Sequence, residues 1–339
     1  MIGFEFFKGL PLEYESFLIG KYDSALTNCR YIEINHPAEI FHYGLVKNEG
    51  YLVDLFIFSI NGKVAKCYNK LVHIDQTVID CFVQKVFEEF SSITKVEIAA
   101  SYNSYSLNKS FLVSSASDFV LSLPLTLNDY FQELGTQTRR HLKNYKSRLT
   151  RDFPQALFVT KSKNEIDRES VDRIIQLNID RMVHKGITPG KTDTDKEKYY
   201  NYALHYGYVT YIEIENTIVA GCIAVILNKT IFLMVVAHDD QFSKYNVGQL
   251  AILNLIEQSI EMNLSEMHFL WGENDYKLRL LAKPKPIFSY QFYRSYSFDF
   301  FLSYAKAFVS RVKIQVRQSK YAKPIRDTVK SYRKKKLRT

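Results

Sequence analysis

Tyr276 and Lys277 lie a few residues beyond an apolar stretch, and their side chains are of types that can assist a group transfer. An ammonium at the end of a strand can stabilise a negatively charged oxygen, and a phenol there can donate a proton to a leaving thiolate. With Asp275 they close the segment Gly-Glu-Asn-Asp-Tyr-Lys, which we expect to lie beyond a strand from Glu266 to Trp271. An exposed turn rich in charge is the alternative interpretation.

The elements before this segment predict how it is positioned. An apolar strand begins at Thr230, and a helical pattern runs from Gln249 to about Met262. Two strands joined by such a helix should be parallel, with the helix N-terminus at the same edge as the strand ends. Free amides at that N-terminus attract anions, and Gly248 would let a ligand approach the backbone closely. From the residues alone, an ordinary polar loop that caps the helix is the simpler interpretation.

A basic helix upstream supplies cations suited to phosphates or carboxylates. Its start is marked by Thr126 or Asn128 as a cap, and Pro154 ends it. A solvated helix face is the alternative. One face carries Arg139, Arg140, Lys143, Lys146 and Arg148.

Two further places could contact an amine-bearing acceptor. His184 and Lys185 precede Gly186 near the end of a predicted helix, where a histidine can also simply interact with the helix dipole. His238 begins a polar turn at the end of the strand from Thr230, where a base could deprotonate an amine. The pattern assigns no general base.

The order of these pieces resembles the GNAT acyltransferase superfamily, in its CelD-like branch related to the FemAB proteins. The resemblance rests on the strand, the Asn-Val-Gly loop, the long helix, the second strand and Gly-x-x-x-Tyr-Lys. The segments Thr138–Tyr145 and Asn178–Gly186 are also similar to their counterparts there. The likeness covers roughly Leu121 to Arg294.

The resemblance implies acyl-coenzyme A, most simply acetyl-coenzyme A, as co-substrate and no metal. It implies that Tyr276 and Lys277 lie beside the reacting acyl group, and that Arg139 and Arg140 bind the acceptor. The loop lacks the glycine-rich phosphate loop of the wider superfamily, so coenzyme A binding departs from the usual pattern here. The implied cofactor-binding residues are Val235, Val236, Asn246, Val247, Gly248 and Gln249.

Length and patterning predict an α+β fold with mixed sheets. The 339 residues exceed the usual limit of a single core. The order hairpin, helix, strand occurs twice, at Tyr51–Ala100 and Val209–Trp271, as expected of tandem GNAT-like domains. The first copy is degenerate, because its strand-to-helix turn has no glycine and no Tyr-Lys pair follows. We expect domains at 1–124 and 125–298, with a basic helical tail at 299–339.

Composition narrows the classes of protein. Four scattered cysteines without a CxxC pair argue against a zinc site and favour a reducing cytosol. The N-terminus lacks the basic lead of a signal peptide, and no run of eighteen apolar residues occurs. We expect a cytoplasmic location, and peripheral attachment to the inner face of the cell membrane is a further interpretation.

The net charge of +9 is concentrated at the C-terminus, where residues 311–339 hold twelve Lys or Arg and one acid. Next to an amphipathic aromatic helix, these charges suit an anionic membrane surface. Nucleic-acid binding and a merely solvated tail are the alternatives.

The sequence therefore predicts an N-acyltransferase that acts on an amino group, with an amino sugar or a cell-envelope polysaccharide precursor as the acceptor by family analogy. A Fem-like aminoacyltransferase drawing on aminoacyl-tRNA is the alternative within enzymes, and only then would nucleic acid be a partner. A non-catalytic scaffold on the membrane is the alternative from another class.

Overall fold

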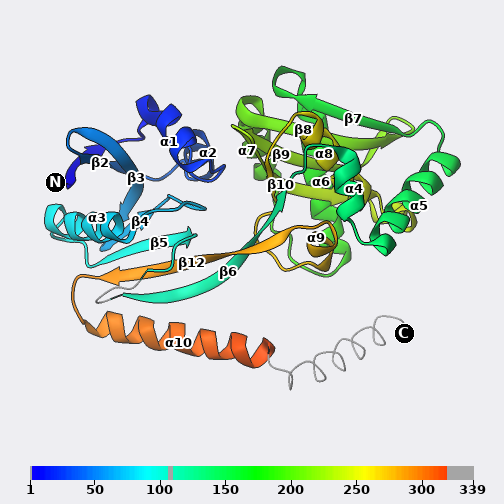
Figure 1. The fold of residues 1–339 in the computed structure, drawn as a ribbon. Helices are drawn as coiled ribbons and strands as arrows, with labels where there is room; N and C mark the ends of the chain where they lie inside the picture. Colours follow the sequence, from blue (N-terminus) through cyan, green and yellow to red (C-terminus); the bar gives the residue numbers. More distant parts are fainter. Residues whose placement is uncertain (1, 106–109, 319–339) are drawn as a thin grey trace.

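A computed structural model describes residues 2–105 and 110–318 and shows one continuous mixed sheet of twelve strands (Figure 1). The strand order is β1-β2-β3-β4-β5-β12-β6-β11-β10-β9-β8-β7. The strands are β1 Ile2–Lys8, β2 Phe41–Asn48, β3 Tyr51–Asn61, β4 Val64–Cys67, β5 Lys95–Ser101, β6 Ser110–Ser122, β7 Leu157–Ser162, β8 Gly207–Ile214, β9 Thr217–Leu227, β10 Thr230–His238, β11 Glu266–His268 and β12 Lys283–Tyr293. The helices are α1 Glu15–Tyr22, α2 Cys29–Asn35, α3 Gln76–Glu89, α4 Leu127–Glu133, α5 Thr136–Asp152, α6 Arg168–His184, α7 Asp193–Tyr206, α8 Val247–Glu261, α9 Asp275–Arg279 and α10 Phe298–Gln318.

The two halves of this sheet repeat one plan, as the tandem GNAT-like prediction requires. In each half, antiparallel strands lead to a strand–helix–strand unit whose two strands are parallel: β4-α3-β5 in the first half and β10-α8-β11 in the second. The hairpin predicted at Asn61-Gly62 joins β3 to β4, with Gly62 in the left-handed region at φ +58°.

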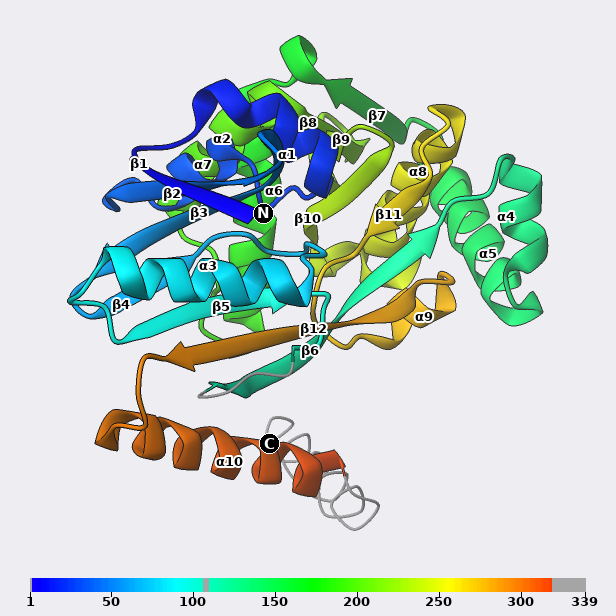
Figure 2. The ribbon, with the colours of Figure 1, turned by 60° about the vertical axis from the view of Figure 1, so that its left-hand side comes forward.

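The halves exchange their last strands. β12, from the end of the second half, pairs with β5 of the first half, while β6, from the first half, pairs with β11 of the second. β6 and β12 are also long antiparallel partners of each other and cross the molecule together (Figures 1 and 2). The sheet therefore passes from one half to the other without an edge between them.

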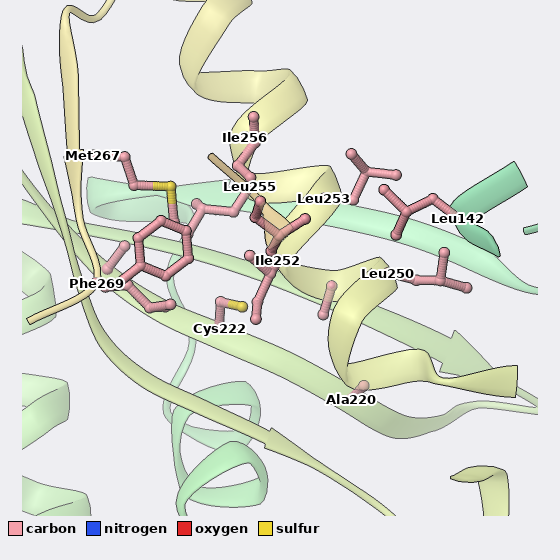
Figure 3. Close-up of a cluster of buried hydrophobic side chains, with 14 of the residues drawn as sticks. Leu142, Ala220, Cys222, Leu250, Ile252, Leu253, Leu255, Ile256, Met267 and Phe269 are labelled. Atoms are coloured by element: carbon pink, nitrogen blue, oxygen red, sulfur yellow. The ribbon is translucent and has the colours of Figure 1, made fainter. Parts of the chain in front are cut away.

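Helix α8 is the centre of the second core. Its apolar residues pack between the sheet and α5, where Leu142 meets Leu250 and Leu253 (Figure 3). Eleven residues of α8 are buried, from Val247 to Ile260. Packing on both sides explains why this helix is apolar around most of its circumference.

Several elements differ from the sequence prediction. The helix predicted from Thr126 or Asn128 to Pro154 is two helices, because Leu134 is extended and Gly135 starts α5. The strand predicted at 266–271 ends at His268, and Asp275–Arg279 is helical. The first 48 residues hold two strands, β1 and β2, for which no period was evident.

Candidate active site

The parallel strands β10 and β11 separate soon after they meet. They pair only at Thr230–Phe232 and Glu266–His268, after which β11 ends and β10 continues to His238. Residues 233–238 of β10 therefore have a strand neighbour on the β9 side alone, and we call this stretch the open edge of β10. A bulge opposite β9 between Leu233 and Val235 bends the strand here. Half of the backbone N–H and C=O groups of the open edge can bind an extended ligand. Both Val235 and Val236 belong to it.

The N-terminus of α8 lies next along the chain. Asn246 adopts the left-handed conformation at φ +54° and provides no side-chain cap. Its own amide donates to Ser243, and that of Gln249 donates back to Asn246. Among the described residues, the amides of Val247 and Gly248 have no acceptor, so these two are the donors left for an anion.

The structure gives a further reason for glycine at position 248. A Cβ atom here would lie 2.6 Å from Nδ1 of His238, so the imidazole ring occupies the space that a side chain would need, and the predicted approach of a ligand to the backbone stays a prediction. Burial, together with the charges of Arg181 and Lys185, lowers the pKa of His238. His238 is therefore a neutral imidazole at pH 7 and can accept a proton.

Tyr276 closes a small cavity of about 60 Å³ beside the N-terminus of α8. Burial raises the pKa of its phenol to about 12, so the group stays a proton donor at neutral pH. Among the described residues, its hydroxyl makes no hydrogen bond, which leaves it available to a ligand. The cavity is lined by Thr138, His141, Tyr145, Asn246, Gln249, Tyr276, Arg279 and Leu280.

Lys277 faces inward, with 2% of its surface exposed. Its Nζ donates to the carbonyl oxygens of Phe269, Leu270 and Trp271 at 3.0, 2.9 and 3.1 Å. Three successive carbonyls converge on one ammonium because Leu270 has left-handed backbone, φ +56°. Burial lowers the pKa of Lys277 to about 8. All three of its N–H donors hold the turn that follows β11, and its predicted role at the oxyanion stays a prediction.

The basic helix turns a different face to the cavity from the one predicted. Thr138, His141 and Tyr145 line it, whereas Arg139 donates to the carbonyls of Gln132 and Leu134 at the end of α4. Arg140 is exposed and does not line the cavity either. Binding of the acceptor by Arg139 and Arg140 stays a prediction, and the structure shows Arg139 as a cap of α4.

Arg181, on α6, is a residue that the sequence analysis missed. Its Nε is buried without a hydrogen-bond partner among the described residues. Its positive charge contributes to lowering the pKa of His238 and opposes the rise in the pKa of Tyr276, so the guanidinium lies in the neighbourhood of both groups. Asn178, one turn earlier, points to the same strand and donates to the carbonyl of Val236 at 3.5 Å. A buried N–H without an acceptor is costly unless a ligand supplies one.

A signal for Arg181 was present in the sequence. Asn178, Arg181 and Lys185 are spaced by three and four residues, so they share one helix face. The segment had been noted for His184 and Lys185 alone. Of these, Lys185 lies near enough to His238 to lower its pKa, while His184 is exposed.

Comparison with known proteins agrees with this geometry. The family model described as "Acetyltransferase (GNAT) domain" matches residues 136–278, which run from α5 to α9. The chain carries a GNAT domain. None of the curated protein sequences compared with it is detectably similar.

Solved structures extend the likeness of fold beyond the GNAT domain to most of the chain. FemX shares 8% identity at a TM-score of 0.64, covering 85% of this chain and 97% of FemX. L-PGS from Bacillus licheniformis shares 12% at 0.53, covering 88% and 98%. A conserved protein of unknown function from Bacteroides thetaiotaomicron VPI-5482 shares 13% at 0.53, covering 86% and 99%. The GNAT domain agrees with the superfamily that the sequence motifs predicted, and the fold of most of the chain resembles that of FemX.

The remaining predicted residue of the GNAT domain is Asp275, the first residue of α9. It is exposed, and its carboxylate lies in the first turn of that helix. A carboxylate there interacts favourably with the helix dipole, and its catalytic role stays a prediction. The described residues include no group of three or more His, Cys, Asp or Glu side chains that could hold a metal ion.

Proposed function

We propose that this protein transfers an acyl group, most simply acetyl, from acyl-coenzyme A to an amino group of a sugar or cell-envelope polysaccharide precursor. The observation that carries the proposal is the open edge of β10 beside the N-terminus of α8. A pantetheine chain carries amides that can pair with a strand edge, and its pyrophosphate suits the free amides of Val247 and Gly248.

The chemistry follows from the groups around the open edge. The amine attacks the thioester carbonyl, a C–N bond forms and the C–S bond breaks. Neutral His238 accepts the proton that the amine loses, and the phenol of Tyr276 donates one to the departing thiolate. Arg181 supplies positive charge near both residues, where it can stabilise the negative charge that develops on the carbonyl oxygen.

Calorimetric titration with acetyl-coenzyme A tests the donor. We expect saturable binding, and Arg181→Met should weaken it about 10- to 100-fold, as for a lost hydrogen bond to a charged group. Arg30→Met is the matched control, because Arg30 pairs with Glu33 on the surface of α2, outside the GNAT domain. Binding that is equally strong in both variants would remove Arg181 from the site.

A Fem-like aminoacyltransferase is the second candidate, favoured by the likeness of fold to FemX. It predicts no binding of any acyl-coenzyme A and a transfer activity that ribonuclease abolishes. A scaffold without catalytic activity predicts neither acyl-coenzyme A binding nor transfer. Two measurements separate the three candidates: the titration with acetyl-coenzyme A, and an assay of transfer in donor extracts with and without ribonuclease treatment.

A further inference from the structure

Helix α10 leaves a row of large apolar side chains on the surface. Phe298 is 83% exposed, Phe301 58% and Phe308 53%, with Leu302 and Tyr304 also exposed. Isolated apolar residues on a surface are ordinary, but a contiguous group indicates a binding surface. We call Phe298, Phe301, Leu302 and Phe308 the outer stripe of α10.

The outer stripe is separate from the contact that holds α10 to the body. Phe300 and Ala307, seven residues apart, are buried against Phe111 of β6 and Tyr293 of β12. Phe301 and Phe308 are also seven residues apart, so they form a second line about 100° further around the helix. The first line makes the contact with β6 and β12, and the second line faces solvent. Figures 1 and 2 show α10 lying outside the sheet, next to β6 and β12.

The charge of this region indicates what covers the outer stripe. Lys306 is exposed between the two phenylalanines, and the sequence from residue 311 onward holds twelve Lys or Arg against one acid. An anionic lipid surface attracts each of these cations, whereas a protein surface of ordinary composition lacks the negative charge to pair with so many. Aromatic side chains beside cations are typical of helices that lie in the headgroup region of a membrane.

Nothing in the described residues anchors the chain more deeply. No described helix combines the length and apolarity needed to cross a bilayer. A nucleic-acid backbone would bind the cations, but it would not contact a continuous apolar line, because its affinity comes from the charge of its phosphates. We propose that α10 docks flat on an anionic membrane, with the outer stripe between the headgroups, and that the positive charge of the C-terminal sequence adds to the attraction.

Flotation of the full chain with vesicles tests this. We expect binding to phosphatidylcholine vesicles containing one third phosphatidylglycerol, and little binding to phosphatidylcholine alone. The double variant Phe301→Ser, Phe308→Ser should bind at least about tenfold more weakly, because both rings leave the interface. The control pair Tyr51→Ser, Leu125→Ser removes exposed apolar side chains elsewhere and should bind as the parent does.

A fluorescent variant reports the docking itself. Trp271 is the single tryptophan and should show no change when vesicles are added. Phe308→Trp should add an emission that shifts to the blue on anionic vesicles and is quenched by brominated lipid.

Three outcomes would overturn the proposal. Equal binding by the double variant would leave only a charge effect of the tail. A dimer that dissociates in the double variant would make a second copy of the chain the occupant. Transfer RNA that displaces the protein from vesicles, and binds it unchanged in the double variant, would make nucleic acid the partner.

Discussion

Lys277→Met tests whether the cost of burying the ammonium or the gain from its hydrogen bonds has the larger effect on stability. The variant keeps an unbranched side chain and removes the charge. Loss of a hydrogen bond from a charged donor costs about 1.5–3 kcal/mol each. The carbonyl of half-exposed Trp271 can turn to water, so two bonds count in full, at about 3–6 kcal/mol together. Against this, a pKa lowered from 10.5 to about 8 means that the buried charge costs about 3 kcal/mol, which the variant recovers. At pH 7 we expect a net destabilisation of about 0–3 kcal/mol, the difference between these two quantities.

The pH dependence has a definite sign. The folded pKa of Lys277 is below the unfolded one, so between about 8 and 10.5 the unfolded chain binds more protons than the folded chain. The free energy of unfolding of the parent relative to Lys277→Met should therefore rise with pH, by about 2 kcal/mol between pH 8 and pH 10. Other tyrosine and cysteine titrations cancel in this difference.

Urea unfolding of both chains at several pH values measures it. Lys63→Met, at the exposed turn between β3 and β4, is the matched control and should show no such rise. A difference that stays flat would mean that the three carbonyls hold the ammonium charged, and the argument from burial would be wrong. Turnover that is unchanged in the folded variant would limit Lys277 to the role of holding the turn.

Two further perturbations have outcomes fixed by contacts. Gly248→Ala should lower the free energy of unfolding by about 1–3 kcal/mol, because the new Cβ would lie 2.6 Å from the ring of His238. In a His238→Ala background this cost should vanish. A cost that persists there in urea unfolding would contradict the contact. Burial alone would lower the pKa of His268, but the carboxylates of Asp118 (2.6 Å) and Glu266 (3.4 Å) outweigh it and raise that pKa. Stability from this raised pKa is complete below about 6.5 and is lost as the pH rises through the folded value. The parent should therefore lose stability relative to Asp118→Asn from pH 6 to pH 9, and a rising difference would refute the assignment.

The sequence predicted the elements whose pattern is local. α3 and α8 have long periodic apolar patterns, and the β3–β4 turn has Asn-Gly, so all three lie where they were expected. The parallel β10–β11 pair followed from helix length alone. In the site, Tyr276 beside the N-terminus of α8 followed from chain order.

What the sequence could not predict depends on distant contacts. The apolar residues of β1 do not alternate cleanly, because Phe4 and Phe6 pack on Phe82 and Phe90 while the adjacent Phe7 stacks on Tyr43 of β2. The inward direction of Lys277 depends on the left-handed backbone at Leu270, and leucine is not a residue type that indicates such a conformation. Arg181 stands out only in the folded structure, where its charge acts on His238 and Tyr276 and its buried Nε has no acceptor among the described residues.

The exchange of β6 and β12 gives the first half of the chain a part in the site of the second. Phe119, on β6, accepts a hydrogen bond from the amide of Phe269 and donates its own amide to Leu270, and Nζ of Lys277 lies 5.0 Å from the centre of its ring. The turn that carries Tyr276 and Lys277 therefore rests on a strand that precedes the GNAT domain, residues 136–278, in the sequence. A fragment beginning at residue 125 would keep every residue proposed for chemistry and still lose the support under Lys277. If the proposed reaction takes place here, the first half, which has no Tyr-Lys pair of its own, has its part in holding this turn in place.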